Sequence, residues 1–324
     1  MNSKFLATAG LIILGLTTPA AALDCEQGYR AFLHHGGEDC IPENPQRIVT
    51  LHDQSGLLPL LELGVRPIGS AGALAKDGTE YFRRLSGYDT SDVEWLGLYG
   101  EPDREAVAAL EPDLIFTTGN PQGNRELYGS IAPVVVIDMQ KYPLDEALRM
   151  FAEAVNKQGE AAALEAEFRS KAAEVRTQLG ERLGTTTVSI LKYWTDRGTG
   201  FEIQDASSVM GMILAELPLV RPAEESALRP GDSTERSWET LGNHNADVIF
   251  HLHYDNDDLN APSHHDAFKA LDLVKALPVA QAGQIFPLDG AAMVGSSWRK
   301  ATNGLEQISA VLLREDLNRD VVQE

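Results

Sequence analysis

The sequence has little of several features that would each point to a class of protein. Only two of its 324 residues are cysteine, which excludes a disulfide-dense scaffold. Lysine and arginine number 27 against 48 aspartate and glutamate residues, and the formal net charge of −21 argues against nucleic acid or an anionic membrane as a partner. Past residue 22 no apolar run is long enough to span a bilayer. Glycine-rich nucleotide-binding motifs and the G-x-S-x-G elbow of hydrolases are missing too, so we expect no enzyme and no catalytic residues.

The first residues read as a targeting signal. Lys4 precedes the apolar run Phe5–Leu16, and small residues up to Ala22 offer a cleavage site. We therefore expect a cleaved signal peptide and a periplasmic protein; a lipid anchor is the weaker alternative, because Leu23-Asp24 before Cys25 is a poor lipobox.

The two cysteines, Cys25 and Cys40, both lie close to the expected mature start. Outside the cytosol such a pair is expected to form a disulfide. The alternative is a thiolate metal site that includes His34 and His35.

A long helical segment separates two stretches of similar pattern. Residues 158–183 are rich in strong helix formers and repeat apolar residues at helical spacing, while short strands alternate with short helices on either side. The sequence predicts an α/β fold of two Rossmann-like lobes with mostly parallel sheets, joined by a single long α-helix. The predicted segments are a signal peptide at 1–22, an N-terminal extension with the disulfide at 23–46, an N-terminal lobe at 47–157, the linking helix at 158–183 and a C-terminal lobe at 184–324.

Each lobe carries the same short unit. Glu105 and Glu239 are each followed, after seven residues, by Asp-(Leu/Val)-Ile-Phe, and Asp103 and Ser237 stand two positions before them as N-cap candidates. One interpretation is local, because a carboxylate in the first turn of a helix gains about 0.3–1 kcal/mol from the helix dipole. The other is that the two carboxylates, one per lobe, form a docking face for basic residues of a partner.

In these segments the chain resembles the class III periplasmic binding proteins, in the ferric-siderophore and cobalamin branch. The resemblance covers about 45–315 and rests on PQRIV at 45–49, LLELGVRPIG at 60–69, ALEPDLI at 109–115, APVV at 132–135 and the linking helix. It implies that Glu105 and Glu239 dock onto arginines of an ABC transporter permease, and that the protein is a monomer that carries a small-molecule iron chelate. The chain departs from the family pattern at Arg104 and Trp238, which replace the usual leucine before each glutamate, and in its disulfide-bearing extension.

Ligands of open parallel sheets lie beyond the carboxyl ends of the strands, so side chains after the predicted strands are candidates. Arginine offers planar donors to chelating oxygens, and tyrosine and tryptophan offer stacking area. In the N-terminal lobe His52, Asp53 and Tyr99 each follow a predicted strand, and the resemblance places a predicted helix at 77–85, with Arg83, near the cleft. The ligand-binding residues that we predict are Arg84, Tyr99, Tyr193, Trp194, Arg197, Tyr254, Trp298 and Arg299.

Capture of a ferric siderophore is therefore the predicted function, with no cofactor and no protein metal ligands, because the chelator already saturates the iron. A haem or cobalamin receptor of the same fold is one alternative. A zinc receptor is less favoured: His251, His253, His264 and His265 cluster in the sequence, but the N-terminal lobe offers only His52 beyond the extension. The negative net charge favours hydroxamate or mixed chelators over anionic catecholates.

Overall fold

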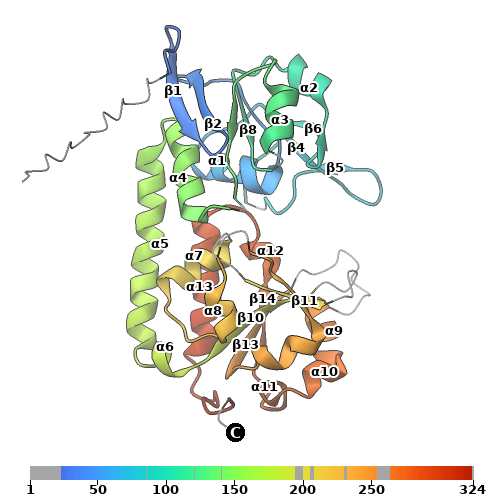
Figure 1. The fold of residues 1–324 in the computed structure, drawn as a ribbon, viewed down its shortest axis with the longest axis vertical. Coiled ribbons are helices and arrows are strands. Elements are labelled where there is room, and N and C mark those ends of the chain that lie inside the picture. Colours follow the sequence, from blue (N-terminus) through green and yellow to red (C-terminus); the bar gives the residue numbers. More distant parts are fainter. Residues whose placement is uncertain are drawn as a thin grey trace, which may run out of the picture.

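The computed structural model describes residues 23–85, 87–119, 121–139, 141–193, 200–204, 208–229, 232–253 and 263–322. The chain forms two α/β lobes, one above the other in Figure 1, with the long helix α5 (Gln158–Leu179) along one side of both. The predicted fold class is confirmed. The expected signal peptide lies outside the described residues, and the predicted boundaries between the segments stay a prediction. Within the described ranges, every helix is too short or too polar to cross a bilayer.

The N-lobe is built on one sheet in the order β7-β6-β4-β3-β8-β9, with β5 added to β4. Its central strands are parallel, and only β5 and β7 pair antiparallel. The strands are β3 (Ile48–Thr50), β4 (Gly69–Leu74), β5 (Glu80–Tyr81), β6 (Glu94–Leu98), β7 (Glu101–Pro102), β8 (Leu114–Thr117) and β9 (Val134–Val136). The helices are the π-helical turn η1 (Asp53–Leu57), α1 (Leu58–Glu62), α2 (Arg104–Ala109), α3 (Pro121–Tyr128) and α4 (Leu144–Ala154).

The C-lobe sheet has the order β12-β11-β10-β13-β14. Here β10, β13 and β14 run parallel, whereas β11 and β12 are antiparallel additions, so this sheet is more mixed than predicted. The strands are β10 (Val188–Lys192), β11 (Gly200–Ile203), β12 (Glu235–Ser237), β13 (Val248–His253) and β14 (Ile285–Asp289). The helices are α6 (Arg182–Thr185), α7 (Val209–Glu216), α8 (Ala223–Ala227), the 3-10 helix η2 (Trp238–His244), α9 (His264–Ala270), α10 (Asp272–Lys275), α11 (Pro278–Gln281), α12 (Gly290–Met293) and α13 (Trp298–Leu312).

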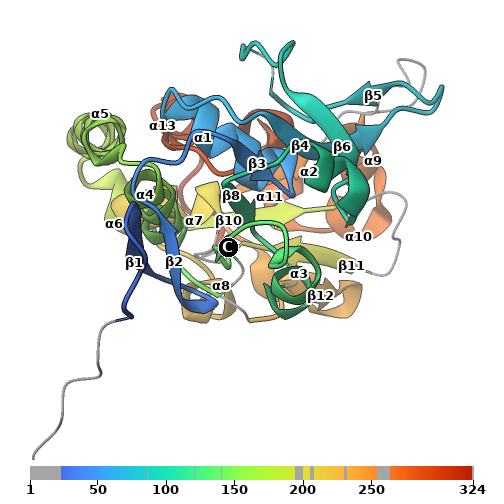
Figure 2. The ribbon, with the colours of Figure 1, turned by 90° about the horizontal axis from the view of Figure 1, so that it is seen from above.

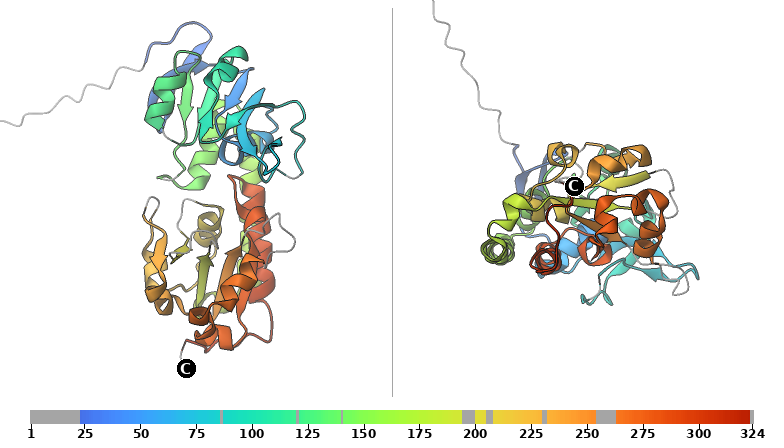
Figure 3. Two further views of the ribbon diagram at one scale, coloured as in Figure 1. Left: turned by 90° about the vertical axis from the view of Figure 1, so that its right-hand side faces the viewer. Right: turned by 90° about the horizontal axis from the view of Figure 1, so that it is seen from below.

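Helix α5 is the predicted linker, and at 1.5 Å per residue its 22 residues span about 33 Å. It ends at Leu179 rather than Leu183, because Gly180 takes the left-handed backbone (φ 54°) that stops a helix. Seen from above, α5 stands at the edge of the molecule (Figure 2), and α13 runs beside it, as the view from below shows (Figure 3). Two adjacent helices thus connect the two levels of the structure.

The N-terminal extension is a hairpin of β1 (Tyr29–His34) and β2 (Gly37–Pro42), joined to the residues before it by the predicted Cys25–Cys40 disulfide, which is confirmed. Its tip covers the outer edge of β9: His35 donates its backbone N–H to the carbonyl of Val136 at 3.1 Å. The Val136 N–H in turn is accepted by Nδ1 of the His34 ring at 3.2 Å. Covering the edge in this way removes an open strand that other chains could pair with.

Acidification should weaken this hairpin through His34. The His34 side chain is fully buried, its Nδ1 accepts backbone N–H groups and its Nε2 lies 2.8 Å from Asp39 Oδ2. Burial lowers the pKa of His34 below the ordinary value of 6.5, so the folded state holds the proton less tightly than the unfolded state does. Stability from this group is therefore present above about pH 6.5 and is lost as pH falls toward the folded pKa. We expect the unfolding free energy of the wild type to drop from pH 7 to pH 5 more than that of His34→Gln, measured by urea titration; parallel curves would contradict this.

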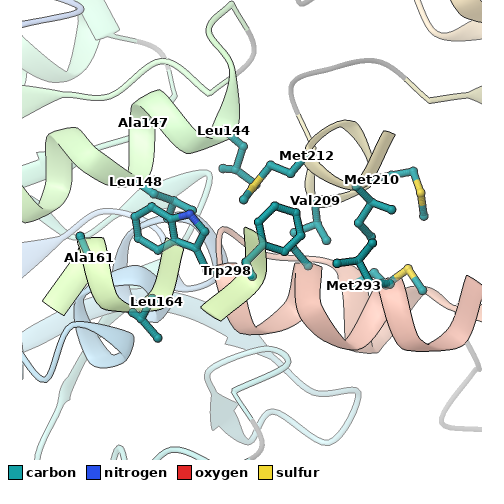
Figure 4. Packing of buried hydrophobic residues seen from close by; sticks show 14 of the residues in the cluster. Leu144, Ala147, Leu148, Ala161, Leu164, Val209, Met210, Met212, Met293 and Trp298 are labelled. Carbon is teal, nitrogen blue, oxygen red and sulfur yellow. The ribbon is translucent and has the colours of Figure 1, made fainter. Parts of the chain in front are cut away.

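One hydrophobic core runs through both lobes rather than stopping at their boundary. It joins Phe116 of the N-lobe sheet, Phe168 of α5 and Phe250 of the C-lobe sheet. Trp298, the first residue of α13, is 1% exposed and lies at the junction. Figure 4 shows its indole among side chains of α4 and α5, with Met212 of α7 nearby and Met293 of α12 farther along the same cluster. The packing fixes the two lobes against each other.

A second joint between the lobes is polar. Glu62, at the end of α1, is 7% exposed and accepts three hydrogen bonds from the start of α13. The donors are the Ser297 hydroxyl at 2.6 Å and the backbone N–H groups of Trp298 at 3.0 Å and Arg299 at 3.1 Å. A carboxylate of one lobe therefore satisfies the otherwise open N–H groups of a helix in the other.

Candidate binding cleft

A cavity of about 240 Å³ lies between the two lobes, near the carboxyl ends of strands from both sheets. Its wall mixes methionine and leucine side chains with lysine, glutamine and serine. This is the place where parallel α/β sheets bind small molecules. The lining residues are Gln54, Ser55, Met139 and Leu144 from the N-lobe side and Lys192, Gln204, Ser208, Val209, Met210, Leu252, Met293, Val294, Gly295 and Ser296 from the C-lobe side.

Next to this cavity, where β3 and β6 end, four N-lobe side chains form a compact group. Asp53 is fully buried and binds Arg83 through its carboxylate, with Nε at 3.0 Å and the backbone N–H at 2.8 Å. The Arg83 guanidinium lies over the Tyr99 ring, 3.6 Å from its centroid, and the His52 ring meets Tyr99 edge-on at 5.2 Å. The result is an arginine, Arg83, that is held in place by the Asp53 carboxylate and stacked on the Tyr99 ring.

The protonation states of Asp53 and His52 are fixed at neutral pH. Burial by itself would raise the pKa of Asp53, but hydrogen bonds and the positive charge of Arg83 hold it below its ordinary value. Burial lowers the pKa of His52 to about 4, with the opposing effect of Asp53 and a further lowering by Arg83 included, so the imidazole stays neutral. The group therefore offers arginine and aromatic surface to a ligand without a change of protonation.

A second, larger cavity of about 410 Å³ lies between Arg84, Gly87 and Tyr88 of the N-lobe and the C-lobe chain from β14 to α13. Arg84, Arg299 and Lys300 line it together with Tyr88 and Asp289. Two of the predicted ligand-binding residues, Arg84 and Arg299, thus meet here although they come from opposite lobes. The predicted helix at 77–85 is wrong: the segment holds a turn and β5, and Arg84 has a φ of 56°.

The other predicted ligand-binding residues are spread out. Tyr99 is exposed and belongs to the Arg83 group, whereas Tyr193 is buried in the C-lobe core against Trp238 and Phe268. Trp298 is buried at the lobe junction. Trp194, Arg197 and Tyr254 lie outside the described residues.

The two repeated glutamates have the same local structure. Glu105 is exposed in the first turn of α2, with the Asp103 side chain as N-cap, and Glu239 is exposed in the first turn of η2, with Ser237 as N-cap. Each cap accepts the backbone N–H of its glutamate, at 2.8 Å and 3.4 Å. Both carboxylates therefore remain at the surface of their lobes.

The histidines that cluster in the sequence also lie close together in the structure, where His251 and His265 are tightly packed. His251 and His265 approach to 3.3 Å between their Nδ1 atoms, and the His251 ring stacks on Phe268. Burial lowers the pKa of His265 to about 4 and that of His251 well below its ordinary value. Across the described ranges, no three His, Cys, Asp or Glu side chains are arranged to hold a metal ion.

Sequence reasoning overlooked three charged residues at the lobe boundary. Lys192 is the last residue of β10 and follows an apolar run, so its position in the sequence is that of a strand residue. Lys300 sits beside the predicted Arg299, and Glu62 is the only charge in the apolar segment 57–63. A lone acid among leucines was the available signal for Glu62, but nothing in the sequence points to its partners in α13.

Comparison with known proteins agrees with this architecture. A family model described as "Periplasmic binding protein" matches residues 48–292. Among curated proteins, the probable siderophore-binding lipoprotein YfiY of Bacillus subtilis is 28% identical over 83% of each chain. The ferric enterobactin-binding periplasmic protein FepB of Escherichia coli is 25% identical over 94% of this chain and 96% of its own.

Among solved structures, Staphylococcus aureus SirA complexed with staphyloferrin B superposes with a TM-score of 0.70 at 20% identity, over 88% of this chain and 99% of SirA. That likeness shows a shared fold. Because the family model spans most of the sequence, including the strands of both lobes, the chain belongs to the periplasmic binding protein family.

Proposed function

We propose that the protein captures a ferric siderophore between its lobes and delivers it to an ABC importer in the membrane. The observation that carries the proposal is the interlobe cavity, whose wall alternates apolar and hydrogen-bonding side chains. A ferric siderophore has the matching surface, an apolar carrier around a shell of chelating oxygens. The names of YfiY and FepB, and the siderophore bound to SirA, support the same class of cargo. Binding of a saturated chelate requires neither catalysis nor a cofactor.

We propose that the protein acts in the periplasm, as a monomer from which the signal peptide has been cleaved. The Cys25–Cys40 disulfide supports an oxidising compartment. The relatives are named as a lipoprotein and a periplasmic protein, so a lipid anchor is the alternative. Mass spectrometry of the exported protein distinguishes a free new N-terminus from an acylated one.

The function is tested by titrating the protein with ferric siderophores, haem, cobalamin and zinc while the fluorescence of its four tryptophans is recorded. We expect saturable quenching by at least one ferric siderophore and no chemical turnover of it. Saturation by haem or cobalamin alone would assign the protein to the alternative receptors of this fold. Zinc that survives dialysis, with no response to any siderophore, would favour a metal-ion receptor.

The exposed glutamates are proposed to dock on the permease. Glu105→Ala and Glu239→Ala should each lower siderophore uptake by cells several-fold and leave the affinity of the purified protein unchanged, because each carboxylate contacts the transporter and not the cargo. The matched control is Glu167→Ala, an exposed glutamate on α5. A collapse of affinity in either variant, or equal uptake loss in the control, speaks against the docking role.

A further inference from the structure

The larger interlobe cavity carries an unusual charge for this protein. The whole chain has a net charge of −21, yet this cavity brings Arg84, Arg299 and Lys300 together with a single carboxylate, Asp289, in its wall. Asp289 Oδ1 accepts the backbone N–H of Ala292 at 3.1 Å and so caps α12. The cations therefore outnumber the acids at this place.

The neighbouring acid, Glu62, reduces that excess without cancelling it, because its charge acts on Arg299 and Lys300 and leaves three cations beside two acids. Its carboxylate is occupied by three donors at the start of α13, and it is buried behind the wall. Burial first, and then the positive charge of Arg84, lower the pKa of Lys300 to about 8 against the opposing effects of Asp289 and Glu62. An ammonium with a depressed pKa gains when an anion binds next to it.

The backbone also holds this arrangement in place. Arg84 has a φ of 56°, a left-handed conformation that is uncommon for a residue other than glycine, and its carbonyl accepts a hydrogen bond from Lys300 Nζ at 3.3 Å. Local strain of this kind persists where the surrounding structure fixes it, frequently at ligand sites. The bond ties Arg84 of the N-lobe to the first turn of α13, so both lobes contribute to one pocket.

We infer that this cavity receives the negatively charged oxygens of the cargo, so that the protein takes anionic ferric chelates in preference to neutral ones. The inference rests on the proposed function. Guanidinium groups donate planar paired hydrogen bonds that match carboxylates, and a pocket of about 410 Å³ falls in the range of small-molecule sites. Three hydroxamates cancel the charge of ferric iron, whereas catecholate and polycarboxylate chelates remain anionic. The positive charge of this cavity therefore reverses the expectation of hydroxamate or mixed chelators, which was based on the net charge of the whole chain.

The test is a fluorescence titration of the protein with ferric citrate, ferric enterobactin and the neutral tris-hydroxamate ferrichrome. We expect at least one of the two anionic complexes to bind at least tenfold more tightly than ferrichrome, and its identity separates carboxylate from catecholate cargo. Arg84→Gln and Arg299→Gln should each weaken the anionic complex at least tenfold and change ferrichrome less than twofold. The matched control is Arg314→Gln, which removes an exposed charge at the other end of α13 and should change neither.

A pH series gives an independent readout. Lys300 faces Arg84, Asp289, Tyr88 and the buried Glu62, and its own pKa is lowered to about 8, chiefly by burial. Affinity for the anionic complex should therefore fall between pH 7 and pH 9 in the wild type, and Lys300→Gln should abolish that fall. A thermal melt of each variant confirms that it is folded, and Arg84→Lys, which restores the charge, should recover part of the affinity.

The outcomes separate the two proposals. Ferrichrome binding as tightly as both anionic complexes, or arginine variants that match the Arg314→Gln control, would overturn the preference for anionic cargo and leave siderophore capture standing. Failure of every ferric chelate to bind the folded wild type would remove the proposed function itself.

Discussion

Replacing Trp298 with alanine should lower the free energy of unfolding by about 3–5 kcal/mol, the range for removing a large aromatic side chain from a core. The indole is 1% exposed and lies at the junction of α4, α5 and α13, where the cores of both lobes meet (Figure 4). Its loss would leave a cavity where the lobes are packed together. Urea unfolding followed by circular dichroism measures the change.

Trp238→Ala is the matched control, since Trp238 is only partly buried and packs within the C-lobe alone. We expect it to destabilise the protein less. Trp298→Phe tests the sequence-based idea that this residue contacts the ligand: it keeps most of the packing, and we expect unchanged siderophore affinity. A large loss of affinity with normal stability would return Trp298 to the binding site.

Glu62→Ala should cost about 3 kcal/mol of stability, because it leaves three donors at the start of α13 without their acceptor. Glu62→Gln should cost less. Its amide oxygen can still accept from Ser297 and Arg299, whose donors share Oε1, but its NH2 group faces the N–H of Trp298.

Urea unfolding ranks the two variants, and hydrogen exchange at the amides of Trp298 and Arg299 localises the effect. We expect those amides to lose protection in Glu62→Ala while the rest of α13 keeps it. If Glu62→Ala loses no more stability than the exposed Glu167→Ala, the polar joint between the lobes contributes nothing measurable.

The sequence was informative wherever a local pattern is sufficient. The long helix follows from composition and apolar spacing, and its deeply buried face, including Leu164, Phe168 and Val175, is the predicted one. The Cys25–Cys40 pair follows from count and compartment. The capped first turns at Glu105 and Glu239 follow from the residues two positions before them.

Features that depend on distant partners could not be predicted in this way. An aromatic next to an arginine, such as Trp298-Arg299, looks the same in sequence whether it faces a ligand or the core. Glu62 binds residues more than two hundred positions later, and no local signal contains that pairing. The segment 77–85 has helix-compatible spacing, but it pairs with β4 through Glu80 and Tyr81 instead, since tertiary contacts override weak propensity.

The pairing of α5 with α13 has a mechanical consequence. Two helices that are packed against each other along their length bend less than one isolated helix. The empty and the ligand-bound protein should therefore have almost the same overall shape. A transporter that distinguishes the ligand-bound from the empty protein would then have to recognise the mouth of the cleft, or the ligand exposed there. The overall shape of the protein would be the same in both states.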